Sequence, residues 1–507
     1  MLFPSPGQNC LFLLLWKLNT LKLMRKHIVK QIILLSVVLF YSLILLGCGQ
    51  ATESQTTRPN ILFILVDDLG KEWISAYGAD NIKTPNVDQL AATGMQFSNA
   101  YVMPQCTPTR LSFLTGQYPY RHGWVNHWDV PRWGGGGHYD WNRNPCISMV
   151  MKEAGYKSAI AGKWQITDFR VQPEAMTEIG FDDYCMWTGG EGDNPPSDER
   201  YWDPYIHTKE GSKIWDGTYG ETVFTDFLID FMKKNKDEPM FLYYPMVLTH
   251  VPLVTTPDEP DVTTDLDKHK AMVRYTDKVL GRLVQALEEL NIRDNTIIVW
   301  TTDNGTDTSI TGHQNGRTVV GAKAKSTEPG LCVPFIVNAP GLVPEGVKTD
   351  ALVDVTDFLP TFAELGGGKL QEGYTYDGKS FADHILGKSE DSNRSWILGM
   401  GGRNEAKLTE DGVENAFVFR DRVIREKRFK LYVSPQRQPE KLVDVLADPA
   451  EEKNLIGSSD PEALAALTRM SAIIPSFPAR DNDPIYTPNP DQPWDVEITA
   501  KSEVWKK

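Results

Sequence analysis

The segment best equipped for chemistry is Cys106-Thr107-Pro108-Thr109-Arg110, which continues into Leu111-Ser112-Phe113-Leu114-Thr115-Gly116. It sets a cysteine four residues before an arginine, with a proline between them. Taken alone, the segment is compatible with a buried structural cysteine beside a proline turn. A reactive role for Cys106 therefore depends on whether other parts of the chain supply matching groups.

Two pairs of oxygen-bearing side chains follow two apolar runs. Residues 60–66 lead into Asp67-Asp68, and residues 296–302 lead into Asp303-Asn304. Such runs are typical of buried strands in a parallel sheet, whose carboxyl ends carry ligand sites. Either pair alone is more typical of a helix cap or a turn. Together they form an all-oxygen set that favours a hard cation, and calcium fits better than zinc.

These segments, in this order, resemble the type I sulfatases, and the resemblance covers most of the chain after residue 58. It implies an α/β fold of the alkaline phosphatase type: a mainly parallel sheet sandwiched by helices, then a smaller α+β subdomain with an antiparallel sheet. It also implies that a formylglycine-generating enzyme oxidises Cys106 to formylglycine, whose hydrated aldehyde is the nucleophile. One calcium ion per site is implied, with ligands at Asp67, Asp68, Asp303, Asn304 and the modified Cys106.

The resemblance extends to the residues that would surround the sulfate. Arg110 matches the arginine that holds the formylglycine, and Lys163 in Gly162-Lys163-Trp164 matches a lysine that contacts the sulfate. His250 matches a histidine near the leaving oxygen. Lys323 aligns with the second lysine of the site, although Lys325 competes for that role. In the implied reaction one diol oxygen attacks sulfur, the sugar oxygen leaves with a proton from His250 or a lysine, and the second diol oxygen expels sulfate.

Two segments depart from the family pattern. The family usually has Gly-Lys-Trp-His, whereas this chain has Gln165 after Trp164. That histidine can act as a base when the sulfated intermediate collapses. Glutamine donates and accepts hydrogen bonds but takes no proton near neutral pH, so Gln165 is expected to bind substrate or diol by hydrogen bonding. The second departure is the sequence 328–332, where the family usually has a Gly-Gly-basic sequence.

The charge balance limits the possible partners. The chain has 52 basic and 67 acidic residues, and its formal net charge is −15. An acidic protein of this kind is not expected to bind nucleic acid nonspecifically. If its substrate is an anionic sulfated saccharide, the cations must be concentrated at the site, where Arg110, Lys163, Lys323 and calcium would stabilise charge on the leaving oxygen.

The N-terminus predicts export. Residues 28–47 are strongly apolar and follow Arg25, Lys26 and Lys30, as in a secretory signal, and Met24 is a possible true start. Leu45-Leu46-Gly47-Cys48 resembles a bacterial lipobox, which predicts a lipid anchor on Cys48 and a place in the outer membrane. A plain transmembrane anchor is the alternative. The predicted divisions are a signal at 1–47, a polar tether at 48–58, a catalytic domain at 59–388 and a C-terminal subdomain at 389–507.

The middle of the chain alternates apolar runs with segments of helical period. Helices are expected to open near 84–91, to cover 272–283 and to close the catalytic domain at 354–362; buried strands are expected at 241–244 and 335–337. In the tail, strands are expected at 428–432 and 442–445, and a helix at 461–473. Six cysteines permit at most one internal disulfide once Cys48 and Cys106 are modified, since Cys10 precedes the cleavage site.

Residues 124–141 combine a glycine run with many aromatic side chains. They could form a mobile loop with stacking platforms for sugar rings, or aromatics that simply pack a long loop onto the body. Four further side chains could reach a substrate by proximity alone: Arg121, His122, His313 and Arg317.

The sequence therefore predicts a carbohydrate sulfatase. Two alternatives stay open. A phosphodiesterase or phosphonate hydrolase could share this fold and nucleophile. A non-catalytic glycan-binding protein could have kept the fold, and Gln165 is the feature that favours it.

Overall fold

The computed structural model describes residues 24–25, 58–125, 139–188, 200–401, 406–409, 412–415, 417–487, 490 and 493. The chain divides into two compact units, Met1–Thr57 and Arg58–Lys507. Nearly all of the predicted signal and tether lie outside the described residues. Within the ranges just given, none of the helices is both long enough and apolar enough to cross a membrane.

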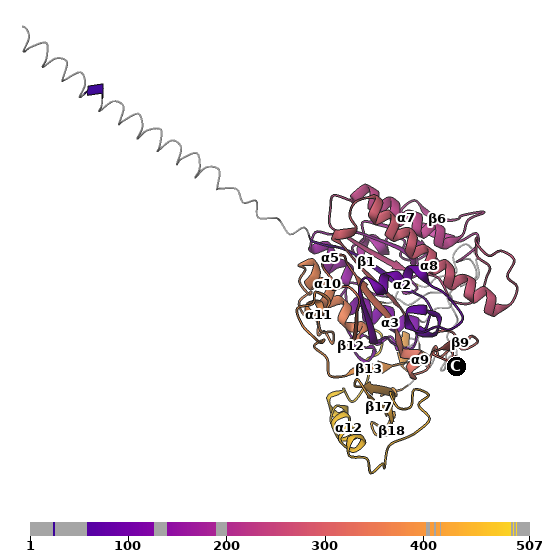
Figure 1. Ribbon diagram of the computed structural model, residues 1–507, viewed down its shortest axis with the longest axis vertical. Helices are drawn as coiled ribbons and strands as arrows, with labels where there is room; N and C mark the ends of the chain where they lie inside the picture. Colours follow the sequence, from indigo (N-terminus) through magenta and orange to yellow (C-terminus); the bar gives the residue numbers. More distant parts are fainter. Residues whose placement is uncertain are drawn as a thin grey trace, which may run out of the picture. The chain divides into compact units, whose positions relative to one another are not determined.

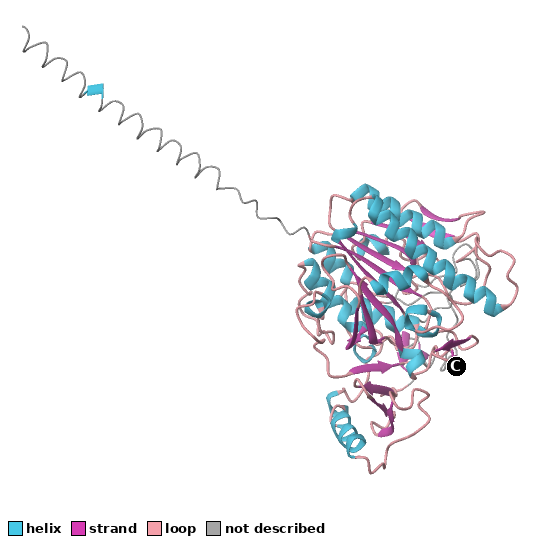
Figure 2. Cartoon of the chain, in the orientation of Figure 1, coloured by secondary structure: helices cyan, strands magenta, loops and turns pink. Residues whose placement is uncertain are grey.

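A ten-stranded sheet forms the centre of the second unit (Figures 1 and 2). From β8 to β4 the neighbouring strands are parallel, and β11, β5 and β6 run antiparallel to their neighbours. The strands, in order across the sheet, are β12 (Val347–Asp354), β2 (Met95–Tyr101), β11 (Cys332–Asn338), β8 (Thr296–Thr302), β1 (Asn60–Val66), β7 (Met240–Pro245), β3 (Lys157–Lys163), β4 (Asp183–Trp187), β5 (Tyr205–Thr208) and β6 (Gly211–Ile214).

Helices cover both faces of this sheet. Alternate residues of β1 point to opposite faces: Phe63 packs with Phe113 and Phe358 on one side, and Leu62 and Ile64 belong to a separate apolar cluster on the other. One face is covered by α3 (Cys106–Thr115), α5 (Ile147–Glu153) and α10 (Phe358–Gly366), and the other by α2 (Pro85–Ala92), α7 (Gly220–Asn235) and α8 (Asp265–Glu289). Burial on both faces explains why β1 reads as a continuous apolar run.

Short elements complete the unit. They are η1 (Lys71–Trp73), η2 (Ser75–Tyr77), α4 (Pro119–His122), α6 (Ala175–Glu178), η3 (Arg293–Asn295), the hairpin of β9 (Thr311–Gln314) and β10 (Arg317–Val320), α9 (Glu328–Leu331), η4 (Val355–Asp357), α11 (Ala382–Ile385), the hairpin of β14 (Ala406–Thr409) and β15 (Gly412–Asn415), and η5 (Ile474–Ser476).

A second, antiparallel sheet follows in the chain (Figure 1). Its strands, in order, are β13 (Ile397–Met400), β16 (Arg422–Arg425), β17 (Phe429–Val433) and β18 (Pro439–Asp444), and α12 (Pro461–Ser471) packs against it. It is tied to the large sheet through α9. Glu328 accepts a hydrogen bond from Tyr101 at 2.7 Å and pairs with Arg425 and Lys430, each at 3.3 Å.

The predicted architecture is confirmed: a mostly parallel sheet between helices, and a small antiparallel sheet with a terminal helix. The unusual sequence 328–332 builds α9, and its glutamate joins the two sheets. Since residues 58–507 form one compact unit, the boundary between 388 and 389 stays a prediction. The four cysteines in the described ranges, Cys106, Cys146, Cys185 and Cys332, are all free.

Candidate active site

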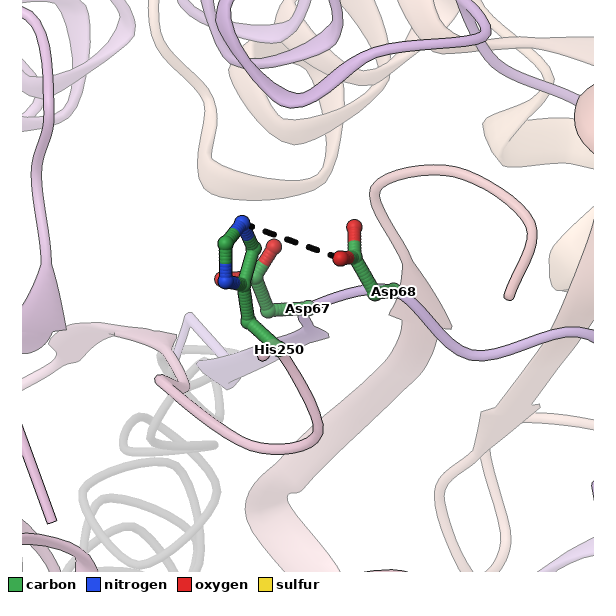
Figure 3. Close-up of side chains that lie close together, drawn as sticks. All are labelled: Asp67, Asp68 and His250. Carbon is green, nitrogen blue, oxygen red and sulfur yellow. Dashed lines mark ion pairs between the residues drawn. The ribbon is translucent and has the colours of Figure 1, made fainter. Parts of the chain in front are cut away.

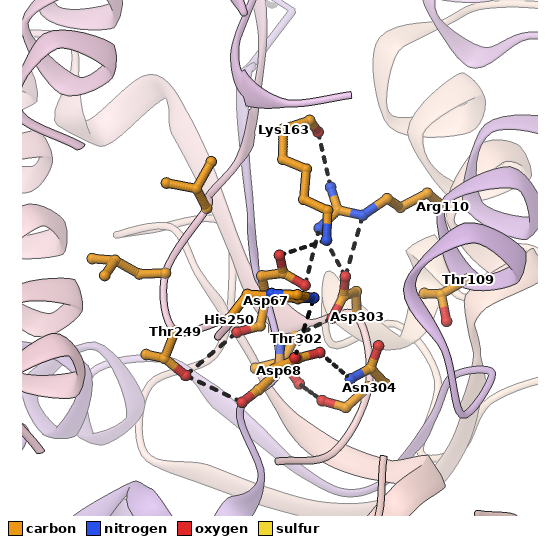
Figure 4. A network of polar contacts seen from close by, with 12 residues as sticks. Asp67, Asp68, Thr109, Arg110, Lys163, Thr249, His250, Thr302, Asp303 and Asn304 are labelled. Atoms are coloured by element: carbon orange, nitrogen blue, oxygen red, sulfur yellow. Dashed lines mark hydrogen bonds and ion pairs between the residues drawn. The ribbon is translucent and has the colours of Figure 1, made fainter. Parts of the chain in front are cut away.

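The site lies at the carboxyl edge of the parallel strands. Val66 of β1 pairs in register with Thr302 of β8, so Asp67 and Asp303 emerge side by side. The backbone N–H of Asp68 donates to Asp303 Oδ1 at 3.1 Å, and Asn304 Nδ2 donates to Asp68 Oδ1 at 2.7 Å. The strand ends thus bring together all four oxygen-bearing residues that the sequence singled out (Figure 4).

Cys106 is the first residue of α3, and every residue of that helix is buried. One turn later, Arg110 sends its guanidinium into the carboxylates. Its Nε and Nη2 donate to Asp303 Oδ2 at 3.2 and 2.7 Å, and its Nη1 donates to the carbonyl oxygen of Lys163 at 3.0 Å. The helix therefore fixes Cys106 at the cluster through a fully buried ion pair.

Two lysines close the cluster. Lys163, the last residue of β3, places Nζ 2.6 Å from Asp67 Oδ2. Lys323 places Nζ 2.6 Å from Asp68 Oδ2, and its segment is held by backbone hydrogen bonds to Thr306 and, through Ala324, to Pro104. Lys325 is exposed and lines a separate pocket, so the geometry favours Lys323 over Lys325.

Close packing fixes the strand end that carries Lys163. Gly162 has a φ of +113°, and a Cβ atom there would lie 2.1 Å from the carbonyl oxygen of Pro245. Only glycine both adopts this positive φ readily and lacks the Cβ atom that would clash with Pro245. Gly162 therefore lets β3 approach β7 closely enough to direct Lys163 toward Asp67.

His250 comes from the loop after β7, with Nε2 3.7 Å from Asp68 Oδ2 (Figure 3). Buried Glu221, at the start of α7, holds that loop: it accepts hydrogen bonds from the backbone N–H groups of Val247 and Leu248 at 2.7 and 2.9 Å. The hydroxyl of Tyr201 donates to the carbonyl oxygens of Val247 and His250. These supports come from elements that carry no recognisable motif.

The charges perturb one another strongly. Burial opposes ionisation of Asp67, but the charges of Lys163 and Arg110 outweigh it and hold its pKa well below the usual range. Burial raises the pKa of Asp303 to about 7, and the Asp67 charge acts in the same direction. Burial also raises the pKa of Asp68. His250 has a pKa well below its usual range, because burial and the Lys323 charge disfavour the imidazolium.

The donor set fits a hard cation. Asp67 Oδ1 and Asn304 Oδ1 are buried and have no hydrogen-bond partner among the described residues. Carboxylate oxygens of Asp67 and Asp68 and a ring nitrogen of His250 lie within 4.8 Å of one another. Buried oxygens without donors are costly unless something positive approaches them. Asp67, Asp68, Asp303 and Asn304 could hold a divalent ion, while Arg110 occupies the second oxygen of Asp303.

Comparison with known proteins agrees with this geometry. The family model described as Sulfatase matches residues 59–368, which is more than half of the chain. The chain belongs to the sulfatase family. Sulfatases hydrolyse sulfate esters, and the formylglycine and divalent-metal chemistry that the resemblance implied is general for them.

Individual relatives extend the match beyond residue 368. An N-acetylgalactosamine-6-O-sulfatase of Bacteroides thetaiotaomicron is 28% identical over 503 residues, covering 84% of this chain and 96% of the relative. An ulvan-active sulfatase of Formosa agariphila is 26% identical and covers 84% of each chain. The crystal structure of Ps i-CgsB with k-i-k-neocarrahexaose has a TM-score of 0.69 at 27% identity, covering 83% of this chain and 92% of that one.

The sulfatase also holds site residues that the sequence did not reveal. Arg200 is buried, with its guanidinium 4.3 Å from the ring centroid of Trp187 and its Nη1 3.8 Å from Asp67 Oδ2. Glu221 is the second such residue, because it positions the His250 loop. No motif surrounds either residue, so only their three-dimensional position assigns them to the site.

Several predicted residues lie apart from the cluster. Trp124 and Tyr139 are fully buried in the core, which supports packing at the two ends of the aromatic segment; residues 126–138 lie outside the described residues. His122 is buried and shares a hydrogen bond with Ser112, and Arg121 pairs with Asp377. His313 and Arg317 are exposed on the β9–β10 hairpin.

Removal of the cation should destabilise the fold, because three buried carboxylates would lose part of their compensating charge. We expect chelation to lower the thermal midpoint of the full chain and calcium to restore it. Restoration corresponds to about 2.7 kcal/mol when free calcium is roughly 100 times its Kd. Asn304→Ala should shift the required calcium concentration upward by about tenfold or more, because it removes a ligand oxygen.

Asn338→Ala is the matched control for this experiment. Asn338 is equally buried, but its amide donates to Leu90 and Thr93, away from the cluster. The Asn338→Ala substitution should lower the thermal midpoint but leave the calcium concentration needed to restore it unchanged. A thermal midpoint and a sulfatase rate that both survive exhaustive chelation would contradict the metal assignment.

Proposed function

We propose that this sulfatase removes O-sulfate groups from a sulfated saccharide, with formylglycine at position 106 as nucleophile and one calcium ion in the carboxylate cluster. The observation that carries the proposal is the juxtaposition of Cys106, Arg110, Lys163 and Lys323 around three buried carboxylates. The saccharide is supported by relatives named for N-acetylgalactosamine-6-O-sulfate and ulvan, and by a related structure that holds a neocarrahexaose.

When present, the hydrated aldehyde supplies the attacking oxygen and the cation supplies positive charge. The chain's own residues then orient and neutralise the sulfate. Arg110 fixes the helix that bears position 106, and Lys163 and Lys323 each place an ammonium group 2.6 Å from a carboxylate of the same cluster. Cations placed where negative charge develops lower the barrier most.

Proton transfer can be divided among these groups. Nδ1 of His250 donates to the carbonyl oxygen of Val251, so the neutral ring keeps its lone pair at Nε2. With its pKa well below the usual range, this imidazole is neutral near pH 7, and its Nε2 can accept a hydrogen bond from the substrate or the diol. Donation of a proton to the leaving oxygen by a lysine, Lys323 or Lys163, is then the alternative to donation by His250; burial opposes the charge of Lys323, but Asp68 outweighs it and raises the Lys323 pKa.

We also propose that the protein is exported and anchored by a lipid on Cys48, which would hold the catalytic unit at the outer membrane. The support is the sequence alone: an apolar segment after basic residues, ending in Leu-Leu-Gly-Cys. A polar tether of 48–58 would then separate the anchor from β1.

The nucleophile assignment predicts that Cys106→Ala abolishes sulfate release from sulfated saccharides, because alanine cannot become an aldehyde. Cys185→Ala is the control, since Cys185 is also a buried free cysteine but lies on β4. Sulfate release by ion chromatography and intact mass, which reveals the oxidised cysteine, provide the measurements. A folded Cys106→Ala protein with normal turnover would refute the mechanism.

The same preparation separates the two alternative functions. A para-nitrophenyl sulfate, phosphonate and phosphodiester share one leaving group, so their relative rates show which ester the site prefers. Preference for either phosphorus ester would favour the hydrolase alternative. An unmodified Cys106 in protein made together with a formylglycine-generating enzyme would favour a non-catalytic glycan-binding protein.

The glutamine in place of the usual histidine gives a second prediction. Gln165 is half-buried with φ +69°, and its Oε1 is buried without a hydrogen-bond partner among the described residues. A buried acceptor without a partner in the described structure, two residues after Lys163, supports a role in binding the diol or the substrate. Gln165→Ala should cost roughly 1–3 kcal/mol of transition-state stabilisation. Gln165→His should add to the pH–rate profile an ionisation below histidine's ordinary pKa of about 6.5, because burial and the neighbouring cations disfavour an imidazolium there.

Gln172 provides a matched control for that series. It is also half-buried, and its Oε1 is likewise buried without a partner in the described part of the chain, but it lies outside the cluster. Gln172→Ala should leave the rate and its pH dependence unchanged. Equal profiles for wild type and Gln165→Ala would place Gln165 outside the working site.

The anchor predicts that Cys48→Ser moves the mature protein from the detergent phase to the aqueous phase, or stalls its processing. Cys10→Ser, upstream of the possible start at Met24, should change neither property. Membrane fractionation and N-terminal mass spectrometry provide the measurements. An unlipidated mature protein with a different first residue would exclude the anchor.

A further inference from the structure

A second concavity lies beside the segment that carries Lys323. Its volume is about 650 Å³, and none of the residues of the catalytic cluster lines it. It is lined by residues of η1, β2, the β9–β10 hairpin and the segment 321–332, and by Arg425 of β16 and residues 445–451 after β18. The pocket is therefore shared between the large sheet and the antiparallel sheet.

Three cations of this pocket lack full compensation. Arg317 and Lys325 are exposed, and neither side chain has a hydrogen bond or ion pair with any described residue. Arg425 is only 2% exposed; its Nε lies 3.3 Å from Glu328 Oε1, but its Nη1 is buried without a partner in the described structure. A buried guanidinium nitrogen without an acceptor is costly unless a ligand supplies one.

The carboxylates of the pocket are already engaged. Glu72 is buried and accepts from Thr306. Glu328 accepts from Tyr101, and Glu451 lies 3.1 Å from Lys430 Nζ. The ammonium of Lys71 is engaged too, since it donates to the Ser98 carbonyl oxygen and to Cys332 Sγ at 2.8 and 2.9 Å. The cations Arg317, Lys325 and Arg425 therefore give the pocket a net positive charge toward a ligand.

Apolar side chains flank these cations. Val320 on β10 is 53% exposed and Leu446 after β18 is 67% exposed, and both line the pocket. Carbon–hydrogen faces of sugar rings are suited to such surfaces. A pocket that combines apolar walls with a few convergent polar groups is typical of a small-molecule site.

We infer that this pocket binds a second oxyanion, a sulfate or a carboxylate, on a saccharide unit near the one that loses its sulfate. The inference rests on the proposed saccharide substrate. Lys323 contacts Asp68 and Lys325 lines the pocket only two residues later, so the two sites are neighbours along the chain. Arginine and lysine are the side chains that bind such oxyanions most strongly.

The oxyanion can be located directly with selenate as the probe. Crystals of the full chain in selenate should show an anomalous selenium peak beside Arg425 Nη1, in addition to any peak in the catalytic cluster. The peak should disappear in an Arg317→Ala/Lys325→Ala variant. Absence of the peak from wild-type crystals, or its survival in the double variant, would overturn the inference, whether or not the protein proves to be a saccharide sulfatase.

Kinetics then distinguish the two oxyanions. Three oligosaccharides with the same scissile sulfate are needed: one with a second sulfate, one with a carboxylate, and one with neither. The double variant should raise KM about tenfold for the substrate whose second anion is bound, and should leave the third substrate unchanged. Lys234→Ala, an exposed lysine on α7 outside the pocket, is the control. Equal KM changes on all three substrates, or none, would contradict the pocket's role.

Discussion

Three carboxylates buried at one edge of a sheet are the constraint on which the rest of this sulfatase depends. Asp67, Asp68 and Asp303 emerge together because β1 and β8 are parallel and in register. Buried carboxylates of like charge cannot stay ionised without compensation. Arg110, Lys163 and Lys323 supply part of it, and each comes from a different element. The site is therefore also a point at which α3, β3 and the segment after β10 are held together.

The antiparallel sheet takes part in this arrangement. Glu328 stands five residues after Lys323 and pairs with Arg425 and Lys430 of the second sheet. The segment 323–328 is thus fixed at one end by Asp68 and at the other by two buried cations. The segment 328–332, which departs from the family pattern, thus connects the two sheets. The same segment also lines the pocket that contains Arg425.

The family usually has a histidine at the position of Gln165, so His250 and Gln165 differ here in whether their side chains can take a proton. His250 is neutral because burial and neighbouring cations disfavour its charge, and its loop is held by Glu221 from α7. Gln165 offers hydrogen bonds without a titrating group. In the proposed reaction, proton transfer would then depend on the other charged groups of the cluster.

The sequence alone determined the elements whose signal is local. Apolar runs that stop at polar residues identified β1 and β8, so Asp67, Asp68, Asp303 and Asn304 could be named as neighbours before any coordinates. The order of motifs around Cys106 and Lys163 identified the family. Only the tertiary structure determined the roles of residues that act through contacts between distant segments of the chain. The alignment favoured Lys323 but left Lys325 as a rival, and only the fold turns one to Asp68 and the other to a pocket. Arg200 and Glu221 lie in no motif, because their roles come from burial beside residues far away in the chain.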